Sequence, residues 1–210
     1  MDKYFETFDS WNRMASQYED QFMELNLYDH SYQLIISSIK TANAKILEIG
    51  CGPGNISKYL LSRRPNLEIH GIDVAPKMIE IAKKNNPNAH YEIMDARNIN
   101  ELSVKYDAII GGFCLPYLSQ KDSENLIVDS LNLLHKNGLL YLSFIEGDEN
   151  KSGYQTGSTN NRCYVYYHHL EKLENHLLNT GFEILKIFKV DYTRSNGDTE
   201  IHTIIIAEKK

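Results

Sequence analysis

The segment KILEIGCGPGN, residues 45–55, joins a short apolar run to three closely spaced glycines. The run Lys45–Ile49 has the length and composition of a strand that is buried on both faces. Gly50, Gly52 and Gly54 permit a tight turn and a close approach of the backbone to a ligand. A helix after such a turn presents free N–H groups to an anionic group. The spacing G-x-G-x-G differs from the dinucleotide fingerprint G-x-G-x-x-G, and no P-loop lysine follows it.

Beyond this segment the chain alternates short β-rich runs with longer amphipathic stretches. Such alternation is typical of βαβ units, in which helices cover both faces of a parallel sheet. The further strands predicted from the pattern are Glu68–Ile72, Ala89–Met94, Tyr106–Ile110 and Leu139–Phe144. The predicted helices are Ile56–Arg63, Pro76–Asn85, Ser123–His135, which Asn137-Gly138 should end, and Leu170–Asn179, with Gly181 at its C-cap. The fold class is therefore α/β, with a doubly wound sheet.

Three regions depart from this alternation. Phe182–Tyr192 and Glu200–Glu208 are strand-like, and the Asn196-Gly197 pair between them is a strong hairpin signal. The sheet is thus expected to end in an antiparallel pair. Residues 1–42 are expected to be helical and rich in aromatic side chains. Residues 146–163 are rich in Gly, Ser and Asn, and we predict a long loop there, on the substrate side of the sheet.

Composition limits the class of protein. The chain has 210 residues, 42% hydrophobic and 24% charged, which fits one globular domain over residues 1–210. A net charge of −6 argues against a nucleic-acid partner, which requires a basic face. The three cysteines are too dispersed for a disulfide framework or a zinc site, and suit a reducing cytoplasm. No apolar stretch suggests a signal peptide or a membrane span. A cytoplasmic protein without a metal is expected.

Acidic residues end two of the predicted strands. Asp73 lies about 20 residues beyond the glycines, where an acid can accept hydrogen bonds from both hydroxyls of a ribose. Asp95 ends the third strand and could accept a hydrogen bond from an exocyclic amine. Residues 111–113 follow the fourth strand, so they are expected at the same edge of the sheet as Asp73 and Asp95. Open α/β sheets bind ligands at this edge. Two structural alternatives stay open: Asp73 could cap the helix Pro76–Asn85, and Asp95 could cap a short turn.

These motifs resemble those of the class I S-adenosylmethionine-dependent methyltransferases. The glycine motif of that family, E/D-x-G-x-G-x-G, matches residues 48–54 throughout. Asp73 matches its ribose-binding acid, Asp95-Ala96 its adenine-binding pair, and Phe113–Leu118 the segment that borders the methyl-transfer site. The segment FDSWNRMASQYED resembles the F-D-x-x-A-x-x-Y-D motif of the small-molecule branch through Phe8, Asp9, Ala15, Tyr18 and Glu19.

The resemblance implies a Rossmann-like sheet of seven strands, mostly parallel, with an antiparallel C-terminal hairpin and residues 1–42 as a helical lid. It implies transfer of a methyl group from S-adenosylmethionine to an oxygen, nitrogen or carbon of a small-molecule acceptor, with S-adenosylhomocysteine as product and no metal. The cofactor-binding residues that it implies are Tyr18, Glu48, Gly50, Cys51, Gly52, Asp73, Val74, Met78, Asp95, Ala96 and Phe113.

The acceptor is expected between the N-terminal segment, the segment after the fourth strand and the loop after the fifth. Candidate substrate contacts are Tyr117, Glu146, Tyr154, Arg162, Tyr166 and His168. His168 and Tyr117 are also the candidate catalytic residues, because a histidine near the site titrates in a useful pH range. The alternative for His168 is a surface or capping role.

Two other functions fit part of the pattern. A sensor or partner subunit could keep the S-adenosylmethionine pocket and transfer nothing. An NAD-dependent oxidoreductase would share the sheet architecture, but its glycine spacing differs from G-x-G-x-G. The other histidines, His70, His90 and His202 among them, show no metal-ligand spacing and are expected to be surface or structural residues.

Overall fold

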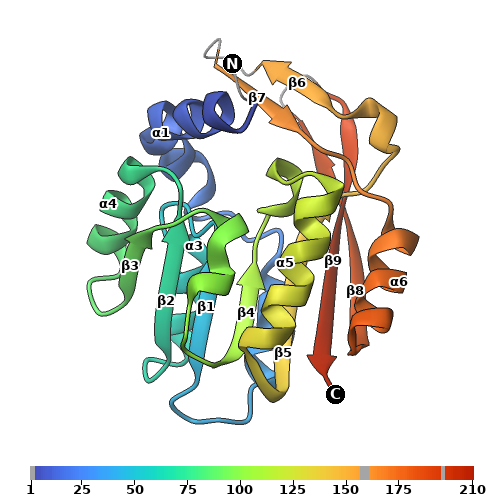
Figure 1. The fold of residues 1–210 in the computed structure, drawn as a ribbon. Helices are drawn as coiled ribbons and strands as arrows, with labels where there is room; N and C mark the ends of the chain where they lie inside the picture. Colours follow the sequence, from blue (N-terminus) through green and yellow to red (C-terminus); the bar gives the residue numbers. More distant parts are fainter. Residues whose placement is uncertain (1–2, 157–160, 195–196) are drawn as a thin grey trace.

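A seven-stranded sheet with the order β3-β2-β1-β4-β5-β9-β8 forms the centre of the molecule (Figure 1). The computed structural model describes residues 3–156, 161–194 and 197–210. The first five strands in this order pair in parallel, and β9 is antiparallel to both of its neighbours. The strands are β1 (Lys45–Ile49), β2 (Glu68–Asp73), β3 (His90–Ile93), β4 (Tyr106–Gly111), β5 (Leu134–Ile145), β8 (Phe182–Thr193) and β9 (Thr199–Lys209). The predicted α/β class and the antiparallel C-terminal pair are confirmed.

Helices cover both faces of the sheet, and two of them precede β1, as predicted. They are α1 (Lys3–Phe22), α2 (Asp29–Ser38), α3 (Asn55–Arg63), α4 (Pro76–Asn85), α5 (Gln120–Leu133) and α6 (Leu170–Thr180), with the 3-10 turns η1 (Ala96–Glu101), η2 (Leu115–Tyr117) and η3 (Glu149–Lys151). Gly181 has a φ of 115° and ends α6, as expected. Among these described helices, none has the length and apolar character that crossing a bilayer requires.

One predicted helix end is wrong. Helix α5 ends at Leu133, and the Asn137-Gly138 pair lies inside β5 rather than after the helix. Asn137 has a φ of 61°, and the β4–β5 register shifts between Leu134 and Leu139. Asn137 and Gly138 therefore accommodate a bulge in β5. Asparagine and glycine suit such a bulge as well as they suit the end of a helix.

The predicted loop over residues 146–163 is also wrong in part. It contains η3 and an antiparallel pair of short strands, β6 (Gly153–Thr156) and β7 (Arg162–Val165). Strand β7 lies against α1: the Ser10 hydroxyl donates to the Arg162 carbonyl oxygen at 2.8 Å, and the Tyr164 N–H donates to Thr7 Oγ1 at 3.0 Å. Tertiary contacts of this kind stabilise strands that local composition does not reveal. Residues 157–160, and Asn196 of the predicted C-terminal turn, lie outside the described residues.

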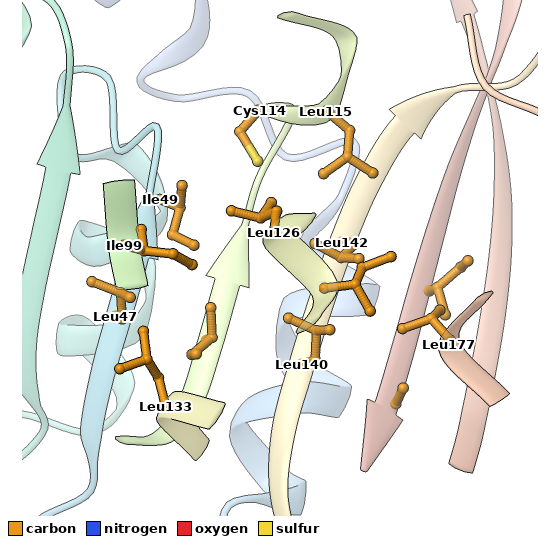
Figure 2. Close-up of a cluster of buried hydrophobic side chains, with 14 of the residues drawn as sticks. Leu47, Ile49, Ile99, Cys114, Leu115, Leu126, Leu133, Leu140, Leu142 and Leu177 are labelled. Carbon is orange, nitrogen blue, oxygen red and sulfur yellow. The ribbon is translucent and has the colours of Figure 1, made fainter. Parts of the chain in front are cut away.

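Apolar side chains fill both faces of the sheet. On one face, leucines and isoleucines of β1 and β5 pack against α5 and α6, as Figure 2 shows for Leu47, Leu142, Leu126 and Leu177. On the other face, β1, β4 and β9 pack against α2 and α3. A strand that is buried on both faces has a continuous run of apolar residues in its sequence. The strand Lys45–Ile49 could be predicted for this reason. This double cover fixes the carboxyl ends of the strands, where the site lies.

Gly54 is the glycine of the turn that tolerates least change. Its φ is 83°, and a Cβ there would lie 2.4 Å from Asn86 Nδ2 and 3.2 Å from the Tyr91 hydroxyl. We expect Gly54→Ala to lower the free energy of unfolding by about 2–4 kcal/mol through backbone strain and overpacking. Urea unfolding measures the change. Gly153→Ala is the control, because a Cβ there meets no described atom within 4 Å. Equal losses in both variants would contradict this account of Gly54.

Candidate functional site

A pocket lies at the carboxyl ends of β1, β2, β3 and β4 and is lined in part by residues of α1. Figure 1 shows where these strands end and where α1 lies. The empty volume of the pocket is about 770 Å³, part of which opens to solvent. The strand order reverses between β1 and β4, so this is the topological switch point at which open α/β sheets bind ligands. The pocket brings together nine of the eleven predicted cofactor residues: Tyr18, Gly50, Gly52, Asp73, Val74, Met78, Asp95, Ala96 and Phe113.

The glycine turn shapes the floor of this pocket. Gly50, Gly52 and Gly54 all have positive φ angles, of 65°, 52° and 83°, which other L-residues rarely adopt. A Cβ on Gly50 would lie 3.2 Å from Cys114 Cβ, so the turn after β1 and the segment after β4 are in close contact. Among the described residues that are not its chain neighbours, a Cβ on Gly52 would meet only Tyr18, at 3.7 Å. Gly52 thus leaves its backbone open to a ligand.

Asp73 links two backbone segments at the pocket. Its Oδ2 accepts a hydrogen bond from the Gly52 N–H at 2.9 Å, and its Oδ1 accepts one from the Ala75 N–H at 2.8 Å. Burial raises the pKa of Asp73, and these backbone donors oppose that shift. The N-cap residue of α4 is Ala75, so the alternative that Asp73 caps this helix is not what the structure shows.

Asp95 combines a structural role with a place in the pocket wall. Its Oδ1 accepts from the Arg97 N–H at 2.9 Å and from Arg97 Nε at 3.0 Å, so it caps η1, as the structural alternative proposed. The Arg97 guanidinium in turn lies 4.0 Å from the centre of the Tyr4 ring, on α1. Asp95 is therefore held in one orientation at the pocket edge.

Glu48, the acid before the glycines, is buried in the interior. Only 1% of its surface is exposed, and the Ser57 hydroxyl donates a hydrogen bond to it. Burial raises the pKa of Glu48 to about 8, so the group is largely protonated at neutral pH. It borders a smaller cavity beside the main pocket, together with Tyr18 and Gly52.

Cys51 does not reach the pocket. Its side chain is buried among Ile79, Ala82 and Tyr91, and burial raises the pKa of the thiol. The prediction that Cys51 contacts a cofactor therefore has no support from its side chain. Its backbone N–H donates to the Ile72 carbonyl oxygen at 2.9 Å and fixes the start of the glycine turn.

Aromatic residues of α1 form the opposite wall of the pocket. The Trp11 ring lies edge-on to Tyr18, at 5.4 Å between ring centres, and to Tyr117, at 5.2 Å. Within the described part of the chain, the Trp11 indole N–H is buried without a hydrogen-bond partner. An unsatisfied donor in a pocket wall is unusual, and a ligand oxygen or nitrogen could accept its hydrogen bond.

Of the predicted substrate contacts, only Tyr117 lines the pocket. Tyr154 and Arg162 lie on the β6–β7 pair, where Arg162 forms an ion pair with Glu6. Glu146 accepts hydrogen bonds from Thr203 Oγ1 at 2.6 Å and from Lys189 Nζ at 2.9 Å. Tyr166 is buried, with its ring 6.4 Å from that of Tyr4. The structure places these four side chains around the β6–β7 pair and the C-terminal strands rather than in the pocket.

His168 is an interior residue, not a group at the pocket. It is fully buried; its Nε2 donates to the Leu115 carbonyl oxygen at 2.8 Å, and its Nδ1 lies 3.2 Å from Gln120 Oε1. Burial lowers the pKa of its imidazole. These contacts link the end of the β6–β7 segment to η2, so the predicted catalytic role has no geometric support.

His202, which was expected to be a surface or structural residue, is buried behind the pocket residue Phe113. Its ring centre lies 4.7 Å from that of Phe113, and its Nδ1 lies 2.7 Å from the Tyr28 hydroxyl. No local sequence signal indicates this position, because β9 joins the sheet from the far end of the chain. The remaining pocket residues are Phe8, Trp11, Met94, Gly112, Cys114 and Leu118. Phe8 belongs to the N-terminal motif, and Gly112, Cys114 and Leu118 belong to the segment that was expected at the site after the fourth strand, whereas Trp11 and Met94 were not predicted as site residues.

Comparisons with known proteins place methyltransferases among the relatives of part of this chain. Residues 46–138 match the family model described as a methyltransferase domain. The putative methyltransferase 235L of Invertebrate iridescent virus 6 is 34% identical over 117 residues, 56% of this chain and 42% of that protein. The malonyl-(acyl-carrier protein) O-methyltransferase of Acetivibrio thermocellus is 37% identical over 89 residues, 41% of this chain and 31% of that protein. This chain thus spans less than half the length of these curated relatives.

A solved structure shares the fold of the whole chain. Magnesium protoporphyrin IX methyltransferase of Synechocystis PCC 6803, with bound SAM, superimposes with a TM-score of 0.72 at 16% identity, over 100% of this chain and 98% of that one. Residues 46–138 thus match a methyltransferase domain, and the chain as a whole shares the fold of a methyltransferase solved with SAM. Gly50, Gly52 and Asp73, which belong to the motifs that carry the resemblance, line the pocket at the switch point.

Proposed function

We propose that this chain binds S-adenosylmethionine in the pocket and transfers its methyl group to a small-molecule acceptor. One observation carries the proposal: the glycine turn, Asp73 and Asp95 converge on one pocket at the switch point of the sheet. We further propose that residues 1–210 act as one domain, with α1 as the cover of the site. Two of the relatives named above are methyltransferases named for different substrates, malonyl-(acyl-carrier protein) and magnesium protoporphyrin IX. The comparisons therefore support the type of reaction but do not indicate the acceptor.

The residues present suit the chemical parts of this cofactor. Asp73 has two carboxylate oxygens for the two ribose hydroxyls, and Val74 and Met78 provide apolar surface for a flat base. Gly52 leaves room for a close approach to its backbone, where the methionine part would lie. Buried Glu48 lies beside the same turn and could pair with an ammonium group, and Trp11 has an unused N–H donor among the described residues.

When bound, S-adenosylmethionine supplies a methyl group on a positively charged sulfonium, which needs little further activation. The main task of the chain is therefore to hold donor and acceptor in line and to exclude water. Tyr18, Trp11 and Tyr117 lie on the wall next to Gly52 and Phe113, so we propose that they align the acceptor. His202 packs behind Phe113, with 4.7 Å between the ring centres.

Titration calorimetry with S-adenosylmethionine, S-adenosylhomocysteine and NAD tests the cofactor assignment. We expect micromolar binding of both adenosyl compounds and none of NAD. Radiolabelled S-adenosylmethionine with a panel of small hydroxyl, carboxyl and amine compounds then tests methyl transfer. Binding of NAD in preference to the adenosyl compounds would overturn the cofactor assignment. Cofactor binding without transfer to any member of a broad panel would favour the sensor role instead.

A further inference from the structure

A group of metal-ligating side chains lies on β2 and β3, away from the residues that line the pocket. His70, His90 and Glu92 each offer one ligand atom, and these atoms all lie within 4.8 Å of one another. The parallel register of the two strands pairs His70 with His90. His90 and Glu92 are two residues apart, so they project from the same face of the edge strand β3.

His70 is the anchored member of this group. Its Nδ1 lies 2.7 Å from the hydroxyl of Tyr106, which is only 2% exposed, and its Nε2 lies 2.7 Å from Glu92 Oε1. The His90 ring is exposed and lies beside it, with 4.9 Å between the ring centres. One ring nitrogen of His70 is thus held by the protein interior, while the other points to the carboxylate and the second histidine.

We propose that His70, His90 and Glu92 form a binding site for a divalent transition metal of the zinc class. Two imidazole nitrogens and one carboxylate oxygen are a donor set that zinc accepts, with water as a fourth ligand, whereas Mg²⁺ and Ca²⁺ prefer oxygen ligands. At zinc–ligand distances of about 2.0–2.2 Å, neighbouring ligand atoms are about 3.4 Å apart. Rotation of the exposed His90 side chain and the half-buried Glu92 side chain closes the remaining gap.

The contact with Tyr106 suits this role. A histidine that binds a metal through one ring nitrogen usually donates its other N–H to a protein oxygen, which fixes the ring orientation and the tautomer. Here His70 Nε2 would bind the metal in place of its hydrogen bond to Glu92, and the Nδ1–H would donate to the Tyr106 oxygen. Tyr106 is therefore a positioning residue for this site.

This cluster could not be predicted from the sequence, because only the register of β2 and β3 brings the three side chains together. His70 and His90 are separated by β2, α4 and the loop before β3, a spacing that matches no local metal motif. A bound metal would link β2 to the edge strand β3. The same two strands lead to Asp73 and Asp95 at the pocket, so the metal would stabilise the part of the sheet that carries both acids.

The test uses the full chain after treatment with a chelator, which is then removed. We expect titration calorimetry with zinc chloride to show one equivalent bound, and cobalt chloride to give the visible absorption bands of a four-coordinate ion. At a metal concentration about a hundredfold above Kd, Tm should rise by about 5–10 °C. Magnesium chloride should leave Tm unchanged.

Variants distinguish this site from adventitious binding. His90→Ala and Glu92→Gln should each weaken zinc binding about tenfold or more, since even outer partners of a metal contribute that much. The control is His135→Ala, an exposed histidine at the start of β5. Absence of zinc binding, or binding that survives both variants, would overturn the proposal and leave a plain Tyr-His-Glu hydrogen-bond network. Both readouts are independent of cofactor binding and of methyl transfer.

Discussion

Replacing Asp73 with alanine is expected to lower the affinity for S-adenosylmethionine and S-adenosylhomocysteine about a hundredfold or more. The variant removes the two carboxylate oxygens assigned to the ribose, and each hydrogen bond to a charged group contributes about 1.5–3 kcal/mol. It also frees the Gly52 N–H, which Asp73 Oδ2 holds at 2.9 Å, so the glycine turn loses a fixed contact. The loss of two such hydrogen bonds exceeds about 2.8 kcal/mol, which corresponds to a hundredfold decrease in affinity. Titration calorimetry measures the affinity directly.

Asp107→Ala is a matched control for that variant. Asp107 lies near the opposite end of the sheet, where its carboxylate accepts hydrogen bonds from the Lys45 N–H at 2.8 Å and from Thr41 Oγ1 at 2.9 Å. Each variant therefore removes a carboxylate that accepts two hydrogen bonds from nearby groups. Of these two aspartates, only Asp73 lines the pocket. Thermal melts establish that each variant folds. Equal cofactor affinity in folded Asp73→Ala and in the parent chain would contradict the assignment of this pocket.

The parts of the fold that were predictable are those that depend on local pattern. The apolar run Lys45–Ile49 and the helix Pro76–Asn85 have the predicted bounds, because burial on both faces and a proline in the first turn leave direct marks in the sequence. The β6–β7 pair was not predicted, because the Gly and Ser residues of this segment suggest a loop. The two strands are stabilised instead by hydrogen bonds between β7 and α1. Local composition cannot report a partner that is 150 residues away.

The same division applies to the site. Strand ends marked by glycines or acids, such as Gly52 and Asp73, were placed correctly at the pocket edge, because parallel strands bring their carboxyl ends to one side. Of the side chains chosen as substrate contacts, Tyr117 lies at the pocket and the other five do not. His168 lies in the interior, whereas His202 reaches Phe113 from a strand at the end of the chain. The pairing of His70 with His90 also depends on register, which a periodic pattern does not fix.

Glu48 is expected to make the stability of the free protein fall as the pH rises. Burial raises the pKa of Glu48 from 4.5 to about 8 in the folded state, so the folded protein keeps a proton that the unfolded chain releases. The stabilising contribution of the protonated group is complete below about pH 4.5 and is lost as the pH rises through 8. At 1.36 kcal/mol per pKa unit, the difference amounts to roughly 5 kcal/mol.

Glu48→Gln isolates this contribution. The glutamine amide oxygen can accept the hydrogen bond from Ser57 and is neutral at every pH, so the variant should lose less stability than the parent chain between pH 5 and pH 9. Chemical unfolding at a series of pH values measures the difference. Glu68→Gln, at the exposed start of β2, should follow the parent profile. Superimposable pH profiles for Glu48→Gln and the parent chain would show that Glu48 is ionised in the folded state. If Glu48→Gln behaves as expected, ionisation of the buried Glu48 side chain lowers the stability of the ligand-free protein at alkaline pH. An ammonium group bound beside the glycine turn would pair with the ionised carboxylate and offset this loss of stability.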